Sequence, residues 1–306
     1  MQIVKLMGGL ANQIREYIYG RYLEYRTGQT VFYDDSWFFI VKIHNGYELK
    51  RVFNLNLPLM SNFFKESVFN EIVEKKIHIY QKLYDMGIDI DLMLEDAVGK
   101  LSFTGKTIPI NEENAFILAD NNRYHYTYGG ATEDYYREIE HIFDKEFVFP
   151  PFPSEIAELA YKIQHTNSVG IHIRHGDFLP LGWCAYPKYY KRCIEYAEQN
   201  TPHELEYYVF SNDQEYCKSH MEEYGFNLIK DRITFVEGNR GVHDYVDFQL
   251  MTICKHIIVA PKSSFSSTAC KLNKTENPRI DWENIGMDYN ETFGFKRNND
   301  EKEIHK

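Results

Sequence analysis

The sequence has few cysteines, no long apolar run and no dinucleotide fingerprint. Its five cysteines are odd in number, scattered, and form no C-x-x-C pair, which indicates reduced thiols in a cytosolic protein, several of them facing a core. No run of 18 apolar residues is present, so we expect no membrane span. The apolar run at the N-terminus is too short for a signal peptide. The pattern G-x-G-x-x-G is not met, so the oxidoreductase fingerprint is absent.

Positive charge is also scarce. The net charge of −11 argues against a nonspecific nucleic-acid-binding protein. An anionic ligand would therefore need a local basic pocket. Tyrosine (24) and phenylalanine (21) are abundant, as is typical of a protein that buries large rings or stacks on planar ligands. A length of 306 residues, 43% of them hydrophobic, is enough for two packed domains.

Strands and helices alternate along the chain, which predicts an α/β fold. Residues 2–7 alternate like a strand, Gly8-Gly9 interrupts them, and 10–27 has helical spacing. This order is the opening of a Rossmann-type unit. The second half is regular and predicts a parallel, doubly wound sheet. Its predicted strands begin at 169, 206, 233 and 256, and its predicted helices include 187–198, 244–254 and 265–272.

The first half of the chain is less regular. We expect strands at 29–33 and 114–119 and helices within 65–94. The triplet Asp89-Ile90-Asp91 could hold a divalent ion through carboxylate oxygens. We interpret it as surface acid, because it has no clear strand–loop setting.

A proline-rich segment divides the chain. Prolines at 150, 151 and 153 form a stiff crossing, which we take as the boundary between domains at 1–150 and 151–306. Ser154 is then expected to cap the next helix. The charged tail from about 296 is expected to be disordered.

The stretch V-G-I-H-I-R-H-G-D-F, residues 169–178, combines a buried strand with ionisable residues at its end. His172, Arg174 and Asp177 lie where open α/β sheets bind ligands. Arg174 is the favoured phosphate ligand, because its guanidinium fork matches phosphate oxygens. The alternative is a structural ion pair between Arg174 and Asp177.

Two further polar clusters follow later strands of the same sheet. Asn212 and Asp213 end the strand that begins at 206, and residues 262–267 span the start of a helix. Free N–H groups and hydroxyls at a helix start can cradle an anion, although serine is also a common cap. Since the carboxyl ends of the strands share one crevice, the three clusters together predict a phosphate-bearing ligand. Asn12, in the first helical turn of the chain, either faces a cleft or ties down the turn.

Several segments resemble the α1,2-fucosyltransferases, the inverting family 11 glycosyltransferases. M-G-G-L-A-N-Q at 7–13 is similar to their G-G-L-G-N-Q, and I-H-I-R-H-G-D-F at 171–178 to their H-x-R-R-G-D-Y. V-F-S-N-D at 209–213 resembles F-S-D-D. The residues at 247–260 and 263–266 resemble the block D-x-x-L-M-S-x-C-K-H-x-I-I-A-N-S-S-F-S. The order and spacing of these segments agree across most of the chain.

The chain departs from the pattern of this family at a few positions. Ala11 replaces a glycine, His175 replaces the second arginine, and Asn212 replaces the first aspartate. Residues 267–271, S-T-A-C-K, replace W-W-G-A-W. This segment resembles the S-x-x-F-S-S type of the wider fucosyltransferase superfamily, which includes core α1,6-enzymes. We expect these differences to bear on the acceptor and the linkage more than on the donor.

The resemblance implies a GT-B arrangement, with two Rossmann-like domains whose parallel sheets face each other across a cleft. Residues 151–306 would bind GDP-fucose, and residues 1–150 would meet the acceptor. The implied roles cover diphosphate binding by Arg174, nucleoside contacts from His172 and from Asp213 or Asn212, base or phosphate contacts from Phe265, Ser266 and Ser267, and contact with the reacting sugar by Asn12.

The implied reaction is a single displacement with inversion, and α1,2 to galactose is the linkage we expect. GDP leaves GDP-β-L-fucose through an oxocarbenium-like state while an acceptor hydroxyl attacks the opposite face. Arg174 and the helix start at Ser264–Ser267 would stabilise the departing diphosphate, so we expect no metal and no cofactor. Asp177 is a candidate general base. Alternatively, Asp177 only orients Arg174, and the departing phosphate accepts the proton.

Two other functions stay open. One is a non-catalytic nucleotide-sugar or glycan-binding protein on the same scaffold, which a GDP-release assay would separate from a transferase. The other is a transferase with another GDP-sugar or linkage, which a donor panel would decide. We expect a bacterial, cytoplasmic enzyme of polysaccharide biosynthesis that acts on an oligosaccharide or lipid-linked glycan. Peripheral association with the inner membrane face is left open, and no nucleic-acid partner is expected.

Overall fold

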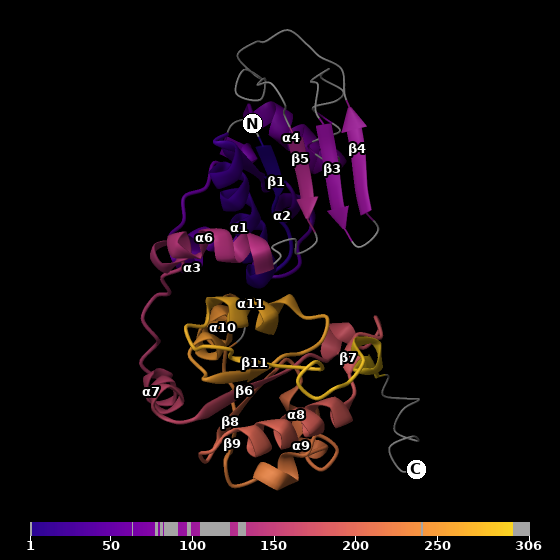
Figure 1. Ribbon diagram of the computed structural model, residues 1–306. Coiled ribbons are helices and arrows are strands. Elements are labelled where there is room, and N and C mark those ends of the chain that lie inside the picture. Colours follow the sequence, from indigo (N-terminus) through magenta and orange to yellow (C-terminus); the bar gives the residue numbers. More distant parts are fainter. Residues whose placement is uncertain are drawn as a thin grey trace. The chain divides into compact units, whose positions relative to one another are not determined.

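The computed structural model consists of two compact units, residues 1–150 and 151–306 (Figure 1). It describes residues 2–62, 64–76, 79, 82, 91–96, 99–104, 123–127, 133–239 and 241–295. The strand expected at 114–119, Asp89 of the acidic triplet and the tail from 296 lie outside these residues.

Unit 1 is built on a five-stranded sheet with the order β2-β1-β5-β3-β4. Four of its strands run parallel, and the edge strand β4 is antiparallel to its neighbour. The strands are β1 (Gln2–Lys5), β2 (Val31–Asp34), β3 (Asp91–Asp96), β4 (Gly99–Thr104) and β5 (Arg123–Thr127). The α-helices described in this unit are α1 (Leu10–Thr27), α2 (Trp37–Ile40), α3 (Leu49–Phe53), α4 (Glu66–Lys75) and α6 (Glu133–Glu146), with a 3-10 turn η1 (Met60–Asn62).

Helix α1 follows β1 through the Gly8-Gly9 turn, as the sequence predicts. Gly8 has a φ of +72°, a conformation that favours glycine, and a Cβ there would lie 2.5 Å from Asn12 Nδ2. The helix buries Ile14 and Ile18 completely. It ends at Gly28, which is left-handed and donates its N–H to Glu24 O. Glycines therefore set both ends of the first helix.

Two local predictions for the chain are wrong. The helical expectation within 65–94 holds for α4, but Asp91 begins strand β3, whose backbone pairs with β4 on one side and β5 on the other. Ladder hydrogen bonds to two neighbours decide the conformation there. Ser154 does not cap α7 (Ala157–His165), because its hydroxyl donates to Glu155 Oε2 at 3.1 Å and a turn precedes the helix.

Unit 2 contains a five-stranded sheet that is parallel throughout, with the order β11-β10-β6-β8-β9. The parallel sheet predicted for this half is thus confirmed. All six residues of the central strand β6 are buried, as expected for a strand covered on both faces. The strands are β6 (Ser168–Ile173), β8 (Glu206–Ser211), β9 (Ile233–Phe235), β10 (His256–Ile258) and β11 (Arg279–Ile280).

Helices cover both faces of the unit 2 sheet. Figure 1 shows α8 (Pro187–Asn200) and α9 (Gln214–Ser219) on one face, and α10 (Asp244–Thr252) and α11 (Ser264–Leu272) on the other. Proline at the start of α8 suits a helical first turn. Short elements complete the unit: η2 (Gly176–Phe178), η3 (Phe226–Ile229), η4 (Gly241–His243), η5 (Tyr289–Glu291), and a two-stranded ribbon of β7 (Cys184–Ala185) with β12 (Phe293–Phe295).

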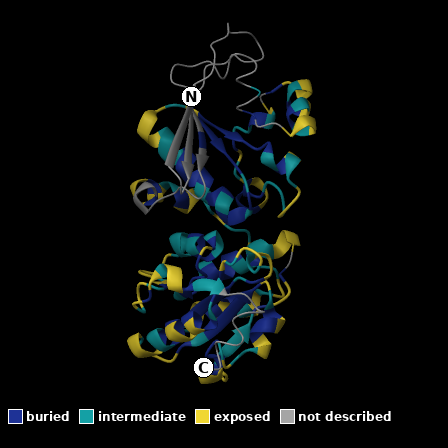
Figure 2. Ribbon diagram, turned by 90° about the vertical axis from the view of Figure 1, so that its right-hand side faces the viewer, coloured by how far each residue is buried: buried dark blue, intermediate teal, exposed yellow. Residues whose placement is uncertain are grey.

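The core of unit 2 is rich in aromatic rings, as the composition predicts. Tyr189, Tyr190, Tyr207 and Tyr224 are each less than 2% exposed, and Figure 2 shows the buried sheet between partly exposed helices. All five cysteines are reduced thiols, and four of them are buried. In the part of the chain that the structure describes, no helix is long and apolar enough to cross a bilayer.

Candidate active site

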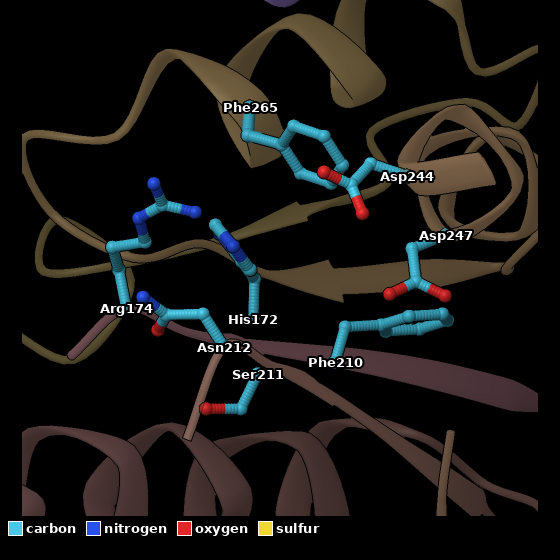
Figure 3. A pocket seen from close by; sticks show the side chains of 8 residues that line it. All are labelled: His172, Arg174, Phe210, Ser211, Asn212, Asp244, Asp247 and Phe265. Carbon is cyan, nitrogen blue, oxygen red and sulfur yellow. The ribbon is translucent and has the colours of Figure 1, made fainter. Parts of the chain in front are cut away.

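A cavity of about 270 Å³ opens where β6 and β8 end (Figure 3). In the sheet, β6 has β8 as its neighbour on one side and β10 as its neighbour on the other. This reversal of strand order is the switch point at which open α/β sheets bind ligands. The cavity is lined by His172, Arg174, Phe210, Ser211, Asn212, Asp244, Asp247 and Phe265.

Arg174 follows the last residue of β6 and lines the cavity. Its Nη2 donates to Asp177 Oδ2 at 2.9 Å, and its guanidinium carbon lies 5.5 Å from the centre of the Phe178 ring. The ion pair considered from the sequence is therefore present. Because this hydrogen bond uses one of three guanidinium nitrogens, the pair is compatible with anion binding by the same side chain.

His172 is buried between Arg174 and Phe265 (Figure 3). Burial and the nearby Arg174 charge lower the pKa of its imidazole from 6.5 to about 3, so the ring is neutral at physiological pH. Its Nδ1 lies 3.0 Å from Ser266 Oγ, which also accepts a hydrogen bond from the Ala260 N–H at 3.1 Å. Ser266 Oγ can donate to Nδ1 or accept from it, so this contact suits either neutral tautomer of His172.

Two rings and two carboxylates line another part of the cavity. Phe210 is the buried residue before the last of β8, and Phe265 lies in the first turn of α11, 5.3 Å from the His172 ring centre. Asp244 and Asp247 come from the first turn of α10. Asp247 Oδ1 accepts a hydrogen bond from Asn239 Nδ2 at 2.6 Å. The site thus pairs a cation and a neutral imidazole with aromatic surface and fixed acceptors.

The serines at the start of α11 have internal partners. Ser263 is the N-cap, and its hydroxyl accepts from the Phe265 N–H at 3.3 Å. Ser267 donates back to Ser263 O and Ser264 O. Ser266 is fully buried behind His172. The described residues that line the cavity do not include Ser263, Ser264, Ser266 or Ser267. Their hydrogen bonds shape the helix start and hold His172, and the direct ligand contacts expected for them stay a prediction.

Asn212 lines the cavity, and its neighbour Asp213 does not. Asp213 caps α9 by accepting from the Tyr216 N–H at 3.3 Å. Asp177 also lies outside the cavity lining, and its side chain is 53% exposed. Its two oxygens accept hydrogen bonds from Arg174 and Asn212. This geometry corresponds to the orienting role considered for Asp177.

Asn12 belongs to unit 1, in the first turn of α1. Its backbone N–H donates to Gly9 O at 3.0 Å, and its side chain lies over Gly8 and is partly exposed. Its predicted role toward the reacting sugar stays a prediction.

Sequence reasoning missed four lining residues: Phe210, Ser211, Asp244 and Asp247. A signal existed for the two acids, because they are spaced i, i+3 in the first turn of a predicted helix. Phe210 and Ser211 lie in the segment V-F-S-N-D at 209–213 that resembles F-S-D-D, but as strand residues they gave no sign of lining a cavity. In the described residues, no group of three or more His, Cys, Asp or Glu side chains could hold a metal ion.

Comparison with known proteins identifies the family. Residues 107–294, more than half of the chain, match the model of glycosyl transferase family 11. The chain belongs to this family. This family 11 protein is also similar to an alpha-1,2-colitosyltransferase of Escherichia coli, with 25% identity over 283 residues that cover 86% of this chain and 84% of the relative.

Among solved structures, the family 11 chain is similar to the fucosyltransferase NodZ from Bradyrhizobium. The TM-score is 0.50 at 14% identity, with 92% of this chain and 95% of NodZ covered. A second structure, the alpha-1,6-fucosyltransferase NodZ soaked with GDP-fucose, also gives a TM-score of 0.50, at 13% identity over 89% of this chain and 91% of that chain. This similarity confirms the α/β fold.

Proposed function

We propose that this chain is an inverting glycosyltransferase that moves L-fucose from GDP-β-L-fucose to a hydroxyl group of a glycan, most simply α1,2 to galactose. The observation that carries the proposal is the cavity at the switch point of unit 2, where Arg174 lies at one side and two rings with two carboxylates at the other. These groups match the parts of a nucleoside diphosphate. Membership of family 11 supports the transferase class, and the similarity to NodZ, which has been soaked with GDP-fucose, supports the donor.

The carboxylates favour guanine over other bases. Guanine presents two adjacent N–H donors, at N1 and the 2-amino group, and a carboxylate is an acceptor with two oxygens. Asp247 is held by Asn239 at the same helix start that carries Asp244. Phe210 and Phe265 supply ring surface on which a base can stack. We therefore assign the base to this side of the cavity.

The departing diphosphate is the energetic problem of the reaction, because negative charge grows on it in the transition state. We assign its stabilisation to Arg174, to the start of α11 at Ser264, and to His172 as its neutral Nε2–H tautomer. Ser266 and Ser267 act on this site through the helix start and His172. The departing phosphate itself can accept the proton of the attacking hydroxyl, so Asp177 is free to orient Arg174.

We propose a GT-B arrangement for the two units, with two Rossmann-like domains facing each other across a cleft. Residues 151–306 would hold the donor, and residues 1–150 would meet the acceptor, with Asn12 toward the reacting sugar. The donor half of this proposal is supported by the cavity in unit 2. The Rossmann-like fold of the first domain is supported by the Gly8-Gly9 turn and α1, which follow the end of β1.

A second donor is favoured by one observation, the similarity to an alpha-1,2-colitosyltransferase. Colitose lacks the 3-hydroxyl of L-fucose, and a site that hydrogen-bonds a hydroxyl strongly rejects the analogue without it. We would measure GDP release from GDP-fucose, GDP-colitose and GDP-mannose, with UDP-galactose as the control, against galactosides and lipid-linked oligosaccharides. Transfer from GDP-fucose supports the first donor, and transfer from GDP-colitose alone supports the second. Binding of GDP-sugars without turnover on any acceptor would indicate the non-catalytic alternative.

A further inference from the structure

A chain of three hydrogen bonds leads from the core of unit 2 to the Arg174 guanidinium. The His175 backbone N–H donates to Asn212 Oδ1 at 2.9 Å, and Asn212 Nδ2 donates to Asp177 Oδ1 at 3.2 Å. The other carboxylate oxygen of Asp177 accepts from Arg174 Nη2 at 2.9 Å. One carboxylate therefore connects the amide of Asn212 with the guanidinium that lines the cavity.

The inner end of this chain is firmly held. The His175 side chain is completely buried, and its Nε2 lies 2.8 Å from the Tyr224 hydroxyl. Its ring packs edge-on against Tyr216 at 4.6 Å between centres. The residue that replaces the family's second arginine thus faces the protein interior. Its backbone presents a fixed donor to Asn212.

The geometry fixes which way the amide at position 212 points. The His175 N–H can only donate, so the Asn212 oxygen must face it, and the NH₂ group then faces Asp177. An aspartate would place a second carboxylate 3.2 Å from an oxygen of Asp177 with no proton between them. The Asn212 side chain is exposed and lies against Gly176, where a Cβ would come within 2.7 Å of Nδ2.

We propose that Asn212 is a positioning residue for glycosyl transfer, which acts through Asp177 to hold the Arg174 guanidinium toward the leaving diphosphate. This inference rests on the proposed function. An arginine side chain has many rotamers, and ordering it before the donor binds lowers the entropy that the transition state must lose. Because Arg174 is assigned to charge that grows in the transition state, we expect the effect mainly on kcat. Asn212 matters through its two hydrogen bonds, whether or not it also touches the nucleoside.

The test compares Asn212→Asp, Asn212→Ala and the double variant Asp177→Asn with Asn212→Asp. In the double variant, the new amide at position 177 donates to the new carboxylate and offers its own oxygen to Arg174, so the chain is rebuilt with the two groups exchanged. We expect Asn212→Asp to lower kcat at pH 8 by roughly tenfold or more, by analogy with loss of a preorganising contact. Activity should recover as the pH is lowered to about 6, because one proton shared between the carboxyls restores a donor.

Asn212→Ala should lose kcat at every pH, and the double variant should recover more activity at pH 8 than Asn212→Asp alone. Asn227→Asp makes the same change at an exposed site of η3 and serves as the control. Melting temperatures on the same preparations show whether each variant folds. If Asn212→Asp does not fold, the loss of kcat is judged from Asn212→Ala instead. An Asn212→Asp enzyme with the kcat and pH profile of the wild type would overturn the proposal, as would a double variant that recovers nothing. Wild-type protein that transfers no sugar would instead overturn the proposed function.

Discussion

Arg174 illustrates how a structural and a functional interpretation of one residue can both hold. The sequence left open whether this arginine forms an ion pair or binds phosphate, and the structure has it paired with Asp177 while lining the cavity. The side chain is 28% exposed and Asp177 is 53% exposed, so the pair contributes little to stability. Its value lies in where it directs the guanidinium.

Replacement of Arg174 separates the two interpretations. Arg174→Ala should lower kcat on the order of 10²-fold, comparable to the loss of one preorganised donor to developing charge. Arg174→Lys retains the charge but loses the fork, and should stay well below wild type. Steady-state kinetics and thermal melts on the same preparations test this. Normal turnover by a well-folded Arg174→Ala would remove the residue from the mechanism.

His172 should make the fold sensitive to acid. Its pKa falls from 6.5 unfolded to about 3 in the folded chain, so the unfolded state binds more protons between these values. Stability is therefore full above pH 6.5 and is lost as the pH falls toward 3, by up to about 1.4 kcal/mol per pH unit from this residue. Urea unfolding between pH 7 and pH 4 should show a shallower pH dependence for His172→Asn, with the exposed His203→Asn as control. An unchanged slope in His172→Asn would contradict this account of the buried imidazole.

Among the elements, those with local signals were the predictable ones. The β1–α1 unit follows from a strand pattern, two glycines and helical spacing, and the strands of unit 2 follow from apolar runs between turns. Strand β3 was not predictable, because its conformation depends on pairing with β4 and β5 rather than on its own residues. The Asn212–Asp177 contact joins residues 35 apart, and only the folded sheet brings them together. Similarly, Asp247 lines the cavity because the fold places the first turn of α10 there.

The two glycines that flank α1 give a matched test of the turn before it. Both have positive φ, so alanine at either site costs about 1–2 kcal/mol of backbone strain. A Cβ at Gly28 meets nothing within 4 Å, whereas at Gly8 it meets Asn12 Nδ2. Gly8→Ala should therefore destabilise the protein more than Gly28→Ala in urea unfolding, and should also lower kcat if Asn12 faces the sugar. Equal losses of stability would mean that the Asn12 contact is unimportant.

For the molecule as a whole, we expect transfer without a metal ion. Arg174 and the start of α11 supply positive charge for the diphosphate in our proposal, which is the role a divalent ion plays in other transferases. Activity should survive EDTA, and should survive Asp89→Ala combined with Asp91→Ala. Loss of activity in both experiments, with Mn²⁺ rescuing the chelated enzyme, would overturn the metal-free mechanism.

The stereochemistry of the product tests the central claim most directly. Proton NMR of the wild-type enzyme with GDP-β-L-fucose, or with GDP-colitose, and a galactoside would follow the donor and the new glycosidic bond together. Single displacement at a diphosphate held by Arg174 predicts an α-linked sugar on the acceptor and one GDP released for each bond formed. A β-linked product, or GDP release with no sugar on any acceptor, would contradict the account.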